Sequence, residues 1–135
     1  MFTHETFIRV RYQETDQMGV VHHGNYASYL ELSRIEWLDA VGFSYKKLES
    51  EGIMLPVYKL DFVFKSPAYF DDELRVRTSL EKLPRASIIF NYEIYNQHGK
   101  LLTTAQSILV FVNKNNWKPI SCPGVILERL KELKI

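Results

Sequence analysis

Residues 13–25 of this chain bring together a carboxylate, two glycines and adjacent histidines, a combination that could act on a carbonyl group. Asp16 lies a few residues ahead of His23, where a long helix is expected to begin. The first backbone amides of a helix have no internal acceptor and carry the positive end of its dipole, so they can bind an oxyanion. A nearby carboxylate could attack a carbonyl or activate water, while Gly19 and Gly24 would let the backbone approach a ligand closely. The pattern outlines an acyl-transfer site, although an Asp ahead of a helix is also a common cap or turn residue.

Other residue types that often carry chemistry are poorly arranged for it. His22 and His23 are adjacent, so they cannot share a helix face as two metal ligands four residues apart would. The remaining histidines, His4 and His98, lie near a terminus and in a predicted turn. Cys122 lies in a late loop without a partner motif, which indicates a bystander thiol. We therefore predict no metal site.

A strand and a long helix are predicted to hold the reactive stretch in place. Residues 7–12 alternate between apolar and charged side chains, which is typical of a half-buried strand, and residues 13–24 form a structured loop. The side chains expected on one face of that strand are Ile8, Val10 and Tyr12. Apolar residues over 26–41 recur at three- and four-residue spacings, which predicts a helix with Asn25 as its N-cap and Gly42 as its stop.

The rest of the chain is predicted to be mostly strands. The expected ranges are 44–51 for a short helical turn, 58–65, 73–80, 88–94 and 101–112 for strands, and 125–133 for a terminal helix. Short turns between the strands imply antiparallel pairing. We therefore predict an α+β fold, in which one long central helix lies across a curved antiparallel sheet of about five strands.

One helix can cover only one face of such a sheet. Apolar side chains interrupt the polar residues predicted for the opposite face, and association between chains would remove them from water. These side chains are Val63, Ile89, Tyr95, Leu109 and Phe111. The pattern therefore predicts an oligomer.

Composition excludes several classes of function. The 135 residues carry 17 Lys and Arg against 16 Asp and Glu, a formal charge of +1, so the electrostatic argument for a nucleic-acid partner is missing. No apolar run approaches the roughly 20 residues of a membrane span, so no integral membrane segment is expected. A single cysteine cannot form an internal bridge, which favours the reducing cytoplasm. The chain is long enough to bury a core and shows no repeat or linker, so we expect one domain over residues 1–135.

Two runs of residues carry a family resemblance. Residues 10–26 read VRYQETDQMGVVHHGNY, in which an Asp precedes a Gly-x-Val-x-x-His-x-x-Tyr run that enters the predicted helix. Residues 65–74 read KSPAYFDDEL, close to a Pro-Ala-x-x-Asp-Asp-x-Leu segment. Both resemble the signature of the 4-hydroxybenzoyl-CoA thioesterase family, and the chain is most similar to its small bacterial acyl-CoA thioesterases. The matching positions are Asp16, Gly19, Val20, His23 and Tyr26, followed by Arg34 and Glu36 in the helix, while His22 stands where a Tyr is frequent.

The resemblance implies the hot-dog fold and hydrolysis of an acyl-CoA to the free acid and coenzyme A. Asp16 would be the nucleophile or general base, and the backbone amide of His23 would polarise the thioester carbonyl. Such hydrolysis needs no metal or redox cofactor, so none is expected. Substrate contacts are assigned to Gly19, Val20, Gly24, Asn25, Tyr26, Pro56, Arg85 and Ser87. The last two match the place where relatives contact coenzyme A, although an ordinary exposed turn explains them equally well.

Three other functions remain open on the same fold. An acyl-carrier-protein thioesterase would differ only in the carrier, whereas a hot-dog dehydratase or a non-catalytic acyl-thioester binding module would not hydrolyse the thioester. The position of Asp16 argues against the last two. Members of the family commonly form dimers with a continuous sheet and often pair again, so the resemblance implies a homodimer or homotetramer with acyl-CoA bound between chains.

Overall fold

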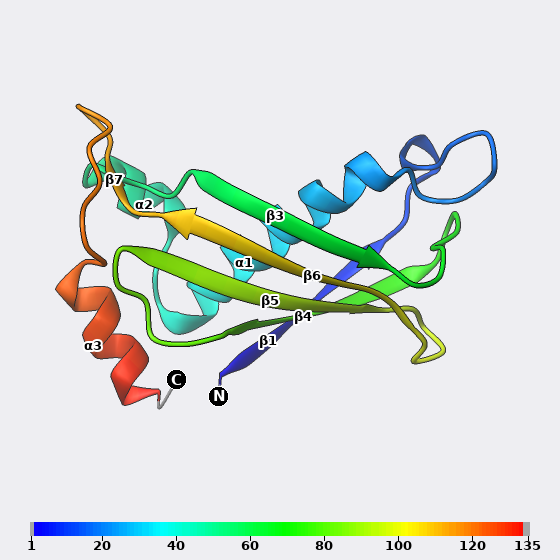
Figure 1. The fold of residues 1–135 in the computed structure, drawn as a ribbon. Coiled ribbons are helices and arrows are strands. Elements are labelled where there is room, and N and C mark those ends of the chain that lie inside the picture. The colour runs from blue at the N-terminus through cyan, green and yellow to red at the C-terminus, as the bar shows by residue number, and fades with distance from the viewer. Residues whose placement is uncertain (1, 134–135) are drawn as a thin grey trace.

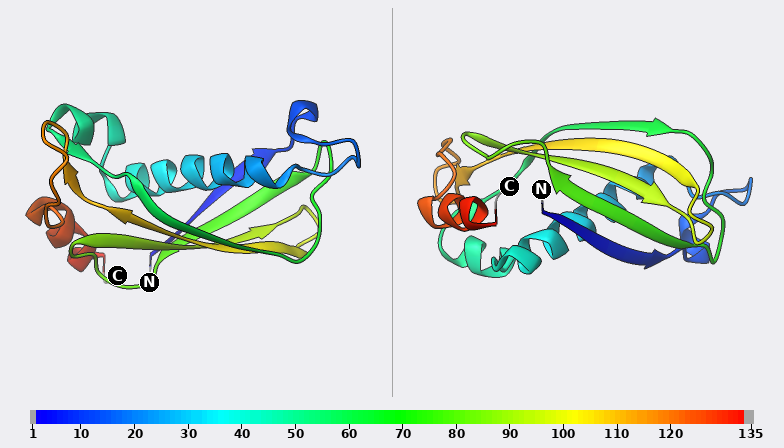
Figure 2. Two further views of the ribbon diagram at one scale, coloured as in Figure 1. Left: turned by 45° about the horizontal axis from the view of Figure 1, so that its top comes forward. Right: turned by 90° about the horizontal axis from the view of Figure 1, so that it is seen from below.

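A five-stranded antiparallel sheet curves around one long helix in the computed structural model, which describes residues 2–133 (Figure 1). The strands lie in the order β1 (Thr3–Arg9), β4 (Glu73–Leu80), β5 (Ser87–Tyr95), β6 (Leu101–Val110) and β3 (Val57–Phe64). Helix α1 (Tyr26–Val41) packs against one face of this sheet, as both views in Figure 2 show. The α+β hot-dog architecture predicted from the sequence is confirmed.

Smaller elements complete the chain at one end of the sheet. They are α2 (Tyr45–Ser50), β2 (Ile53–Met54), β7 (Val112–Asn113) and α3 (Gly124–Glu132). The strand predicted over residues 101–112 is interrupted, because β7 leaves the main sheet to pair with β2. None of the helices within residues 2–133 is long and apolar enough to span a bilayer.

The two ends of α1 differ in how well the sequence predicted them. Gly42 ends the helix with φ at 104°, a left-handed conformation that glycine adopts without steric cost, so its predicted role is confirmed. The prediction of Asn25 as a capping side chain is wrong. Asn25 has helical backbone angles and makes no side-chain cap bond, because a 3-10 turn (His23–Asn25) precedes α1. Its side-chain amide instead donates to the Glu14 carbonyl at 2.8 Å.

The first strand lies earlier in the chain than the alternation suggested. β1 ends at Arg9, Val10 is buried just beyond it, and Tyr12 starts a 3-10 turn with 76% of its surface exposed. Tyr12 therefore does not share a buried face with Ile8 and Val10. The chain must turn at this point because the loop that follows folds back against residues 68–72.

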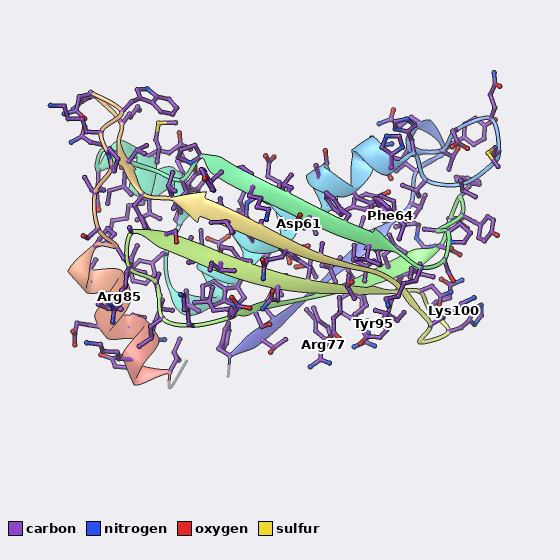
Figure 3. All side chains as sticks on the ribbon, in the orientation of Figure 1. Asp61, Phe64, Arg77, Arg85, Tyr95 and Lys100 are labelled. Atoms are coloured by element: carbon purple, nitrogen blue, oxygen red, sulfur yellow. The ribbon has the colours of Figure 1, made fainter. Side chains whose placement is uncertain are left out.

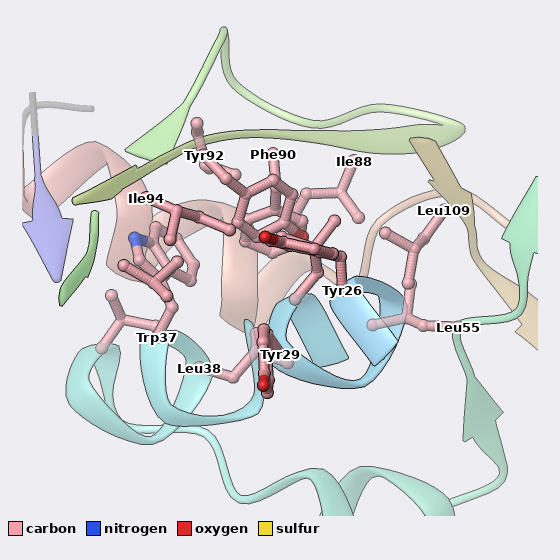
Figure 4. Close-up of a cluster of buried hydrophobic side chains, with 14 of the residues drawn as sticks. Tyr26, Tyr29, Trp37, Leu38, Leu55, Ile88, Phe90, Tyr92, Ile94 and Leu109 are labelled. Carbon is pink, nitrogen blue, oxygen red and sulfur yellow. The ribbon is translucent and has the colours of Figure 1, made fainter. Parts of the chain in front are cut away.

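The core fills the space between α1 and the concave face of the sheet (Figure 4). Trp37 of the helix is fully buried and meets Phe90 of β5 edge to face, with ring centroids 5.3 Å apart. Polar side chains also point inward, and the Tyr92 hydroxyl lies 2.6 Å from the Ser107 hydroxyl. The layer between helix and sheet is thus not uniformly apolar.

The outer face of the sheet is less apolar than predicted. Val63, Ile89 and Tyr95 are at least partly exposed, but Leu109 and Phe111 are buried, so their assignment to this face is wrong. Leu109 pairs with the buried Ile88 on the concave face. Thr103, Ser107 and Leu109 of β6 are all buried and lie at even spacings along the strand, so the alternation is regular over this stretch. Pairing with β5, which local spacing does not specify, decides which of the two sets of residues faces the core.

Candidate active site

The loop that joins β1 to α1, residues 10–25, is held against the segment 68–72 by backbone hydrogen bonds. The Val10 amide donates to the Asp72 carbonyl at 2.9 Å, and the Val21 amide donates to the Ala68 carbonyl at the same distance. These bonds fix both ends of the loop against the end of the sheet where α1 begins. The loop is therefore a defined structure that can position a reactive side chain.

Glu14 is the polar centre of this loop. The residue is only 9% exposed, and one carboxylate oxygen accepts from the Tyr29 hydroxyl at 2.7 Å and the Arg11 amide at 2.9 Å. The other oxygen accepts from the Arg11 guanidinium at 3.0 Å. Its backbone carbonyl accepts from the His22 amide and the Asn25 side chain. One residue thus ties together the start of the loop, its end and the first turns of α1.

The hydrogen bonds decide the ionisation of this carboxyl. Burial is the largest single influence and would raise its pKa, but the bonds from Arg11 and Tyr29 outweigh burial, so the pKa of Glu14 falls below its usual 4.5. Burial and the neighbouring Glu14 carboxylate raise the pKa of the Tyr29 hydroxyl, which stays protonated and donates. At neutral pH the loop is therefore held by an ionised Glu14.

Asp16 is exposed at the tip of the loop in a tight turn. Its Oδ1 accepts from the Met18 amide at 2.8 Å, while its own amide donates to the Val20 carbonyl at 2.9 Å. Gly19 closes the turn with φ at 79°, in the left-handed region, and a Cβ there would meet no atom within 4 Å. The conformation of the backbone, and not close packing, explains the glycine. The turn fixes one carboxylate oxygen, which leaves the other to face a ligand.

The start of the helix offers one free amide. Within residues 2–133 the His23 amide makes no hydrogen bond. The Gly24 amide is already used, since it donates to Nδ1 of His22 at 3.1 Å, and a Cβ on Gly24 would lie 3.2 Å from the same ring nitrogen. His22 is therefore the residue that caps this helix start. The His23 amide remains available to an oxygen atom of a ligand.

Asp16 and His23 border the same hollow, of about 350 Å³, at the end of the sheet where β3 finishes. Its other lining residues are Val20, Val21, Tyr26, Phe64, Lys65, Ser66 and Pro67. A carboxylate, a free amide and apolar walls meet here. That arrangement can bind an acyl group, attack its carbonyl and stabilise the resulting oxyanion.

The remaining predicted contacts lie elsewhere in the chain. Arg85 lies in the turn from β4 to β5, and Ser87 is the first residue of β5. Figure 3 shows Arg85 near α3, at the opposite end of the sheet from Phe64. Pro56 precedes β3 and lines a different cavity, beside α2. Pro56, Arg85 and Ser87 therefore do not line the Asp16 hollow of their own chain. Of the predicted site residues, that hollow contains Asp16, Val20, His23 and Tyr26.

Sequence reasoning missed three contributors to this site. Nothing in the local sequence around Glu14 predicts its burial against Tyr29. His22 was noted only for differing from a frequent Tyr, whereas its ring caps Gly24. Lys65 lines the hollow from the end of β3. The KSPAYFDDEL run was the available signal, because it places residues 65–72 beside the loop.

Nothing else in the described part of the chain forms a second reactive cluster. No group of three or more His, Cys, Asp or Glu side chains among residues 2–133 is placed to hold a metal ion. Burial raises the pKa of the Cys122 thiol to about 11, so at neutral pH it is a protonated and unreactive group. The Asp16 hollow is therefore the candidate site among the described residues.

Comparisons of the sequence and the structure with known proteins agree on one family. Residues 10–130 match the model of the thioesterase-like superfamily. A Bacillus subtilis protein named putative acyl-CoA thioesterase YneP is 36% identical over 84% of this chain and 82% of its own length. The Escherichia coli acyl-CoA thioester hydrolase YbgC is 32% identical over 93% of both chains. The crystal structure of the DHNA-CoA thioesterase from Staphylococcus aureus superimposes with a TM-score of 0.94 at 34% identity, covering 99% of this chain and 92% of that one.

The first prediction concerns the Glu14 cluster. Tyr29→Phe removes a hydrogen bond to a buried carboxylate, so we expect a loss of about 1.5–3 kcal/mol in the free energy of unfolding at pH 7. The pKa of Glu14 is lowered in the folded state, so the stability from its ionised form is complete above pH 4.5 and is lost as the pH falls through the folded pKa. Urea unfolding at pH 7 and pH 3 should show the effect shrinking in acid.

Tyr12→Phe is the matched control, because that residue is 76% exposed and should change stability little at either pH. Equal losses for the two variants would contradict the assigned role of Glu14.

Proposed function

The chain belongs to the thioesterase-like superfamily, and we propose that Asp16 and the His23 amide carry out its reaction, the hydrolysis of acyl-CoA thioesters. The protein is a thioester hydrolase that releases a free acid and coenzyme A from acyl-CoA. One observation carries the assignment of residues: an exposed carboxylate and an unpaired helix-start amide border the same hollow.

Asp16 promotes attack on the thioester carbonyl carbon by either of two routes. As a general base it takes a proton from water, and the resulting hydroxide adds to the carbonyl. As a nucleophile its free oxygen forms a mixed anhydride, which water then cleaves. In both routes the carbon–sulfur bond breaks and the coenzyme A thiolate leaves and takes up a proton. The Met18 amide on Oδ1 holds the carboxylate in position for either route.

The His23 amide supplies the oxyanion contact. The negative charge that develops on the carbonyl oxygen needs a donor that is already in place, and loss of one such donor costs about 2.7–4 kcal/mol in other enzymes. His22 occupies the Gly24 amide, so the His23 amide is the donor that this turn leaves free. Val20 and Tyr26 form the wall of the hollow beside it. Gly19 and Gly24 do not line the hollow and act through the loop conformation, because Gly19 allows the left-handed turn and a Cβ on Gly24 would crowd the His22 ring. The Asn25 side chain contributes indirectly by holding the Glu14 carbonyl.

The active form is proposed to be a dimer or tetramer. β3 is an edge strand of eight residues whose outer side is unpaired within the chain, and it exposes Tyr58, Val63 and Phe64. Such an edge favours pairing with a second copy. Arg85 lies at the opposite end of the sheet from Phe64, which lines the Asp16 hollow, so we assign a coenzyme A contact by Arg85 to the site of another chain.

The compartment that suits this protein best is the cytoplasm. Its one cysteine lies buried beside α3 and is a free thiol. A reducing environment keeps such thiols unmodified. An acyl-CoA substrate also favours the cytoplasm as the compartment.

Asp16→Asn tests the catalytic carboxylate. The amide is nearly isosteric and its oxygen can still accept from the Met18 amide, but it can neither attack nor take a proton, so kcat should fall by at least ~100-fold. Release of free thiol from a panel of acyl-CoAs measures the effect, and Asp39→Asn, on the exposed side of α1, is the control. A near wild-type kcat for Asp16→Asn would remove this residue from the mechanism.

His23→Ala tests whether the main chain or the imidazole acts. The substitution keeps the backbone amide, so we expect kcat to fall far less than in Asp16→Asn. Equal inactivation of the two variants in folded protein, judged by circular dichroism, would show that the imidazole itself takes part.

Light scattering along a dilution series tests the oligomer. Activity should fall where the oligomer dissociates, because the site needs two chains. Mixing Asp16→Asn chains with Arg85→Glu chains should restore part of the activity through hybrid sites. A monomer that keeps full specific activity at nanomolar concentration would overturn the shared site.

A further inference from the structure

A second cavity, of about 420 Å³, opens on the same chain further along α1. Its walls are mostly apolar and come from α1, α2, the start of β3 and the inner face of the sheet. They include Leu38, Leu55, Val57, Phe90 and Leu109. Its volume lies within the range of small-ligand sites. The cavity is separate from the Asp16 hollow, with which it shares no lining residue.

Arg34 is the unusual residue of this cavity. It is 91% buried, since only 9% of its surface is exposed, and it lines the cavity from α1. Its Nη1 has no hydrogen-bond partner, and no carboxylate within residues 2–133 lies close enough to form an ion pair with it. The Tyr92 hydroxyl, which is hydrogen-bonded to Ser107, also interacts with the Arg34 guanidinium, so Arg34 has a neutral partner but no charged one.

Two acidic residues also line this cavity and must be considered. Glu31 is exposed and Glu49 is half-buried, so water can solvate both carboxylates, and neither lies within 4.0 Å of the Arg34 guanidinium. The buried Arg34 cannot be solvated in the same way. A buried cation that lacks a charged partner and leaves Nη1 unbonded is unfavourable, and a ligand that brings a negatively charged acceptor relieves that cost. A carboxylate suits a guanidinium best, because it accepts charge-assisted hydrogen bonds in a matching plane.

β3 connects the two cavities of the chain. Val57, at its start, lines the Arg34 cavity, and Phe64, at its end, lines the Asp16 hollow. Two copies that pair their free β3 edges about a two-fold axis run antiparallel. The start of β3 in one copy then lies beside the end of β3 in the other. This pairing places the Arg34 cavity of the second copy next to the Asp16 hollow of the first.

We propose that the Arg34 cavity of one copy receives the acyl group of the thioester cleaved at Asp16 of the other, and that Arg34 selects acyl groups with a carboxylate at their far end. The apolar walls hold the methylene groups between the thioester and that carboxylate. This inference rests on the proposed function and names the class of substrate: an ω-carboxyacyl-CoA.

The first experiment compares two substrates of equal chain length, adipoyl-CoA and hexanoyl-CoA. Wild-type enzyme should show a kcat/KM at least 10-fold higher for adipoyl-CoA. Arg34→Met should abolish that preference, so that the ratio of the two kcat/KM values falls to about one, and Arg34→Lys should keep part of the preference. Lys131→Met removes an exposed cation on α3 and serves as the control. If both substrates are cleaved equally by the wild type, the inference is wrong; if neither is cleaved, the proposed function is wrong.

The second experiment tests whether the cavity acts across the dimer, and it uses hybrids of two variants. A hybrid of an Arg34→Met chain with an Asp16→Asn chain contains one site with an intact Asp16 and an intact Arg34 on different chains. Excess Asp16→Asn chains should therefore restore the adipoyl preference to the Arg34→Met enzyme. An unchanged preference would overturn the assignment of the cavity to the other copy. If Arg34→Met does not fold, Arg34→Lys replaces it, and the wild-type ratio still decides the substrate class.

Discussion

The buried carboxylate of Glu14 is the interaction on which the site depends. The backbone bonds of the loop are confined to tight turns, and the three donors on the Glu14 carboxylate join those turns to α1. They join Arg11, before the turn, to Tyr29, one turn into α1. With those points fixed, Asp16 can lie exposed at the tip of the loop without losing its position. In the proposed mechanism, therefore, the carboxylate that stabilises the site is Glu14 and the carboxylate that reacts is Asp16.

The same division between stability and reactivity applies to two backbone amides in the 3-10 turn (His23–Asn25) that precedes α1. The His22 ring satisfies the Gly24 amide and so stabilises the helix start, which leaves the His23 amide for the substrate. A helix start with every amide capped would be more stable but could not stabilise an oxyanion. The local sequence of adjacent histidines thus has a physical explanation that does not involve metal binding.

The sheet is only partly covered. The helix α1 packs on one face, and the outer edge of β3 has no neighbouring strand within the described residues. Residues from both ends of that strand line cavities, one beside Asp16 and one beside Arg34. A chain that pairs through this edge would join the two cavities and cover the exposed side chains of β3. In our proposal, the same association stabilises the sheet and completes the substrate site.

Local signals in the sequence were sufficient for most of the fold and for the reactive loop. Periodicity predicted α1, β3, β4 and β5, Gly42 marked the helix end, and the motif resemblance identified Asp16 and the helix start. These features depend on neighbours within a few residues. Tertiary structure alone decided the burial of Leu109, the side-chain contacts of Asn25 and Glu14, and the separation of Pro56 and Arg85 from Asp16. Each of these depends on which distant segments meet, and the spacing of residues along one chain does not specify that.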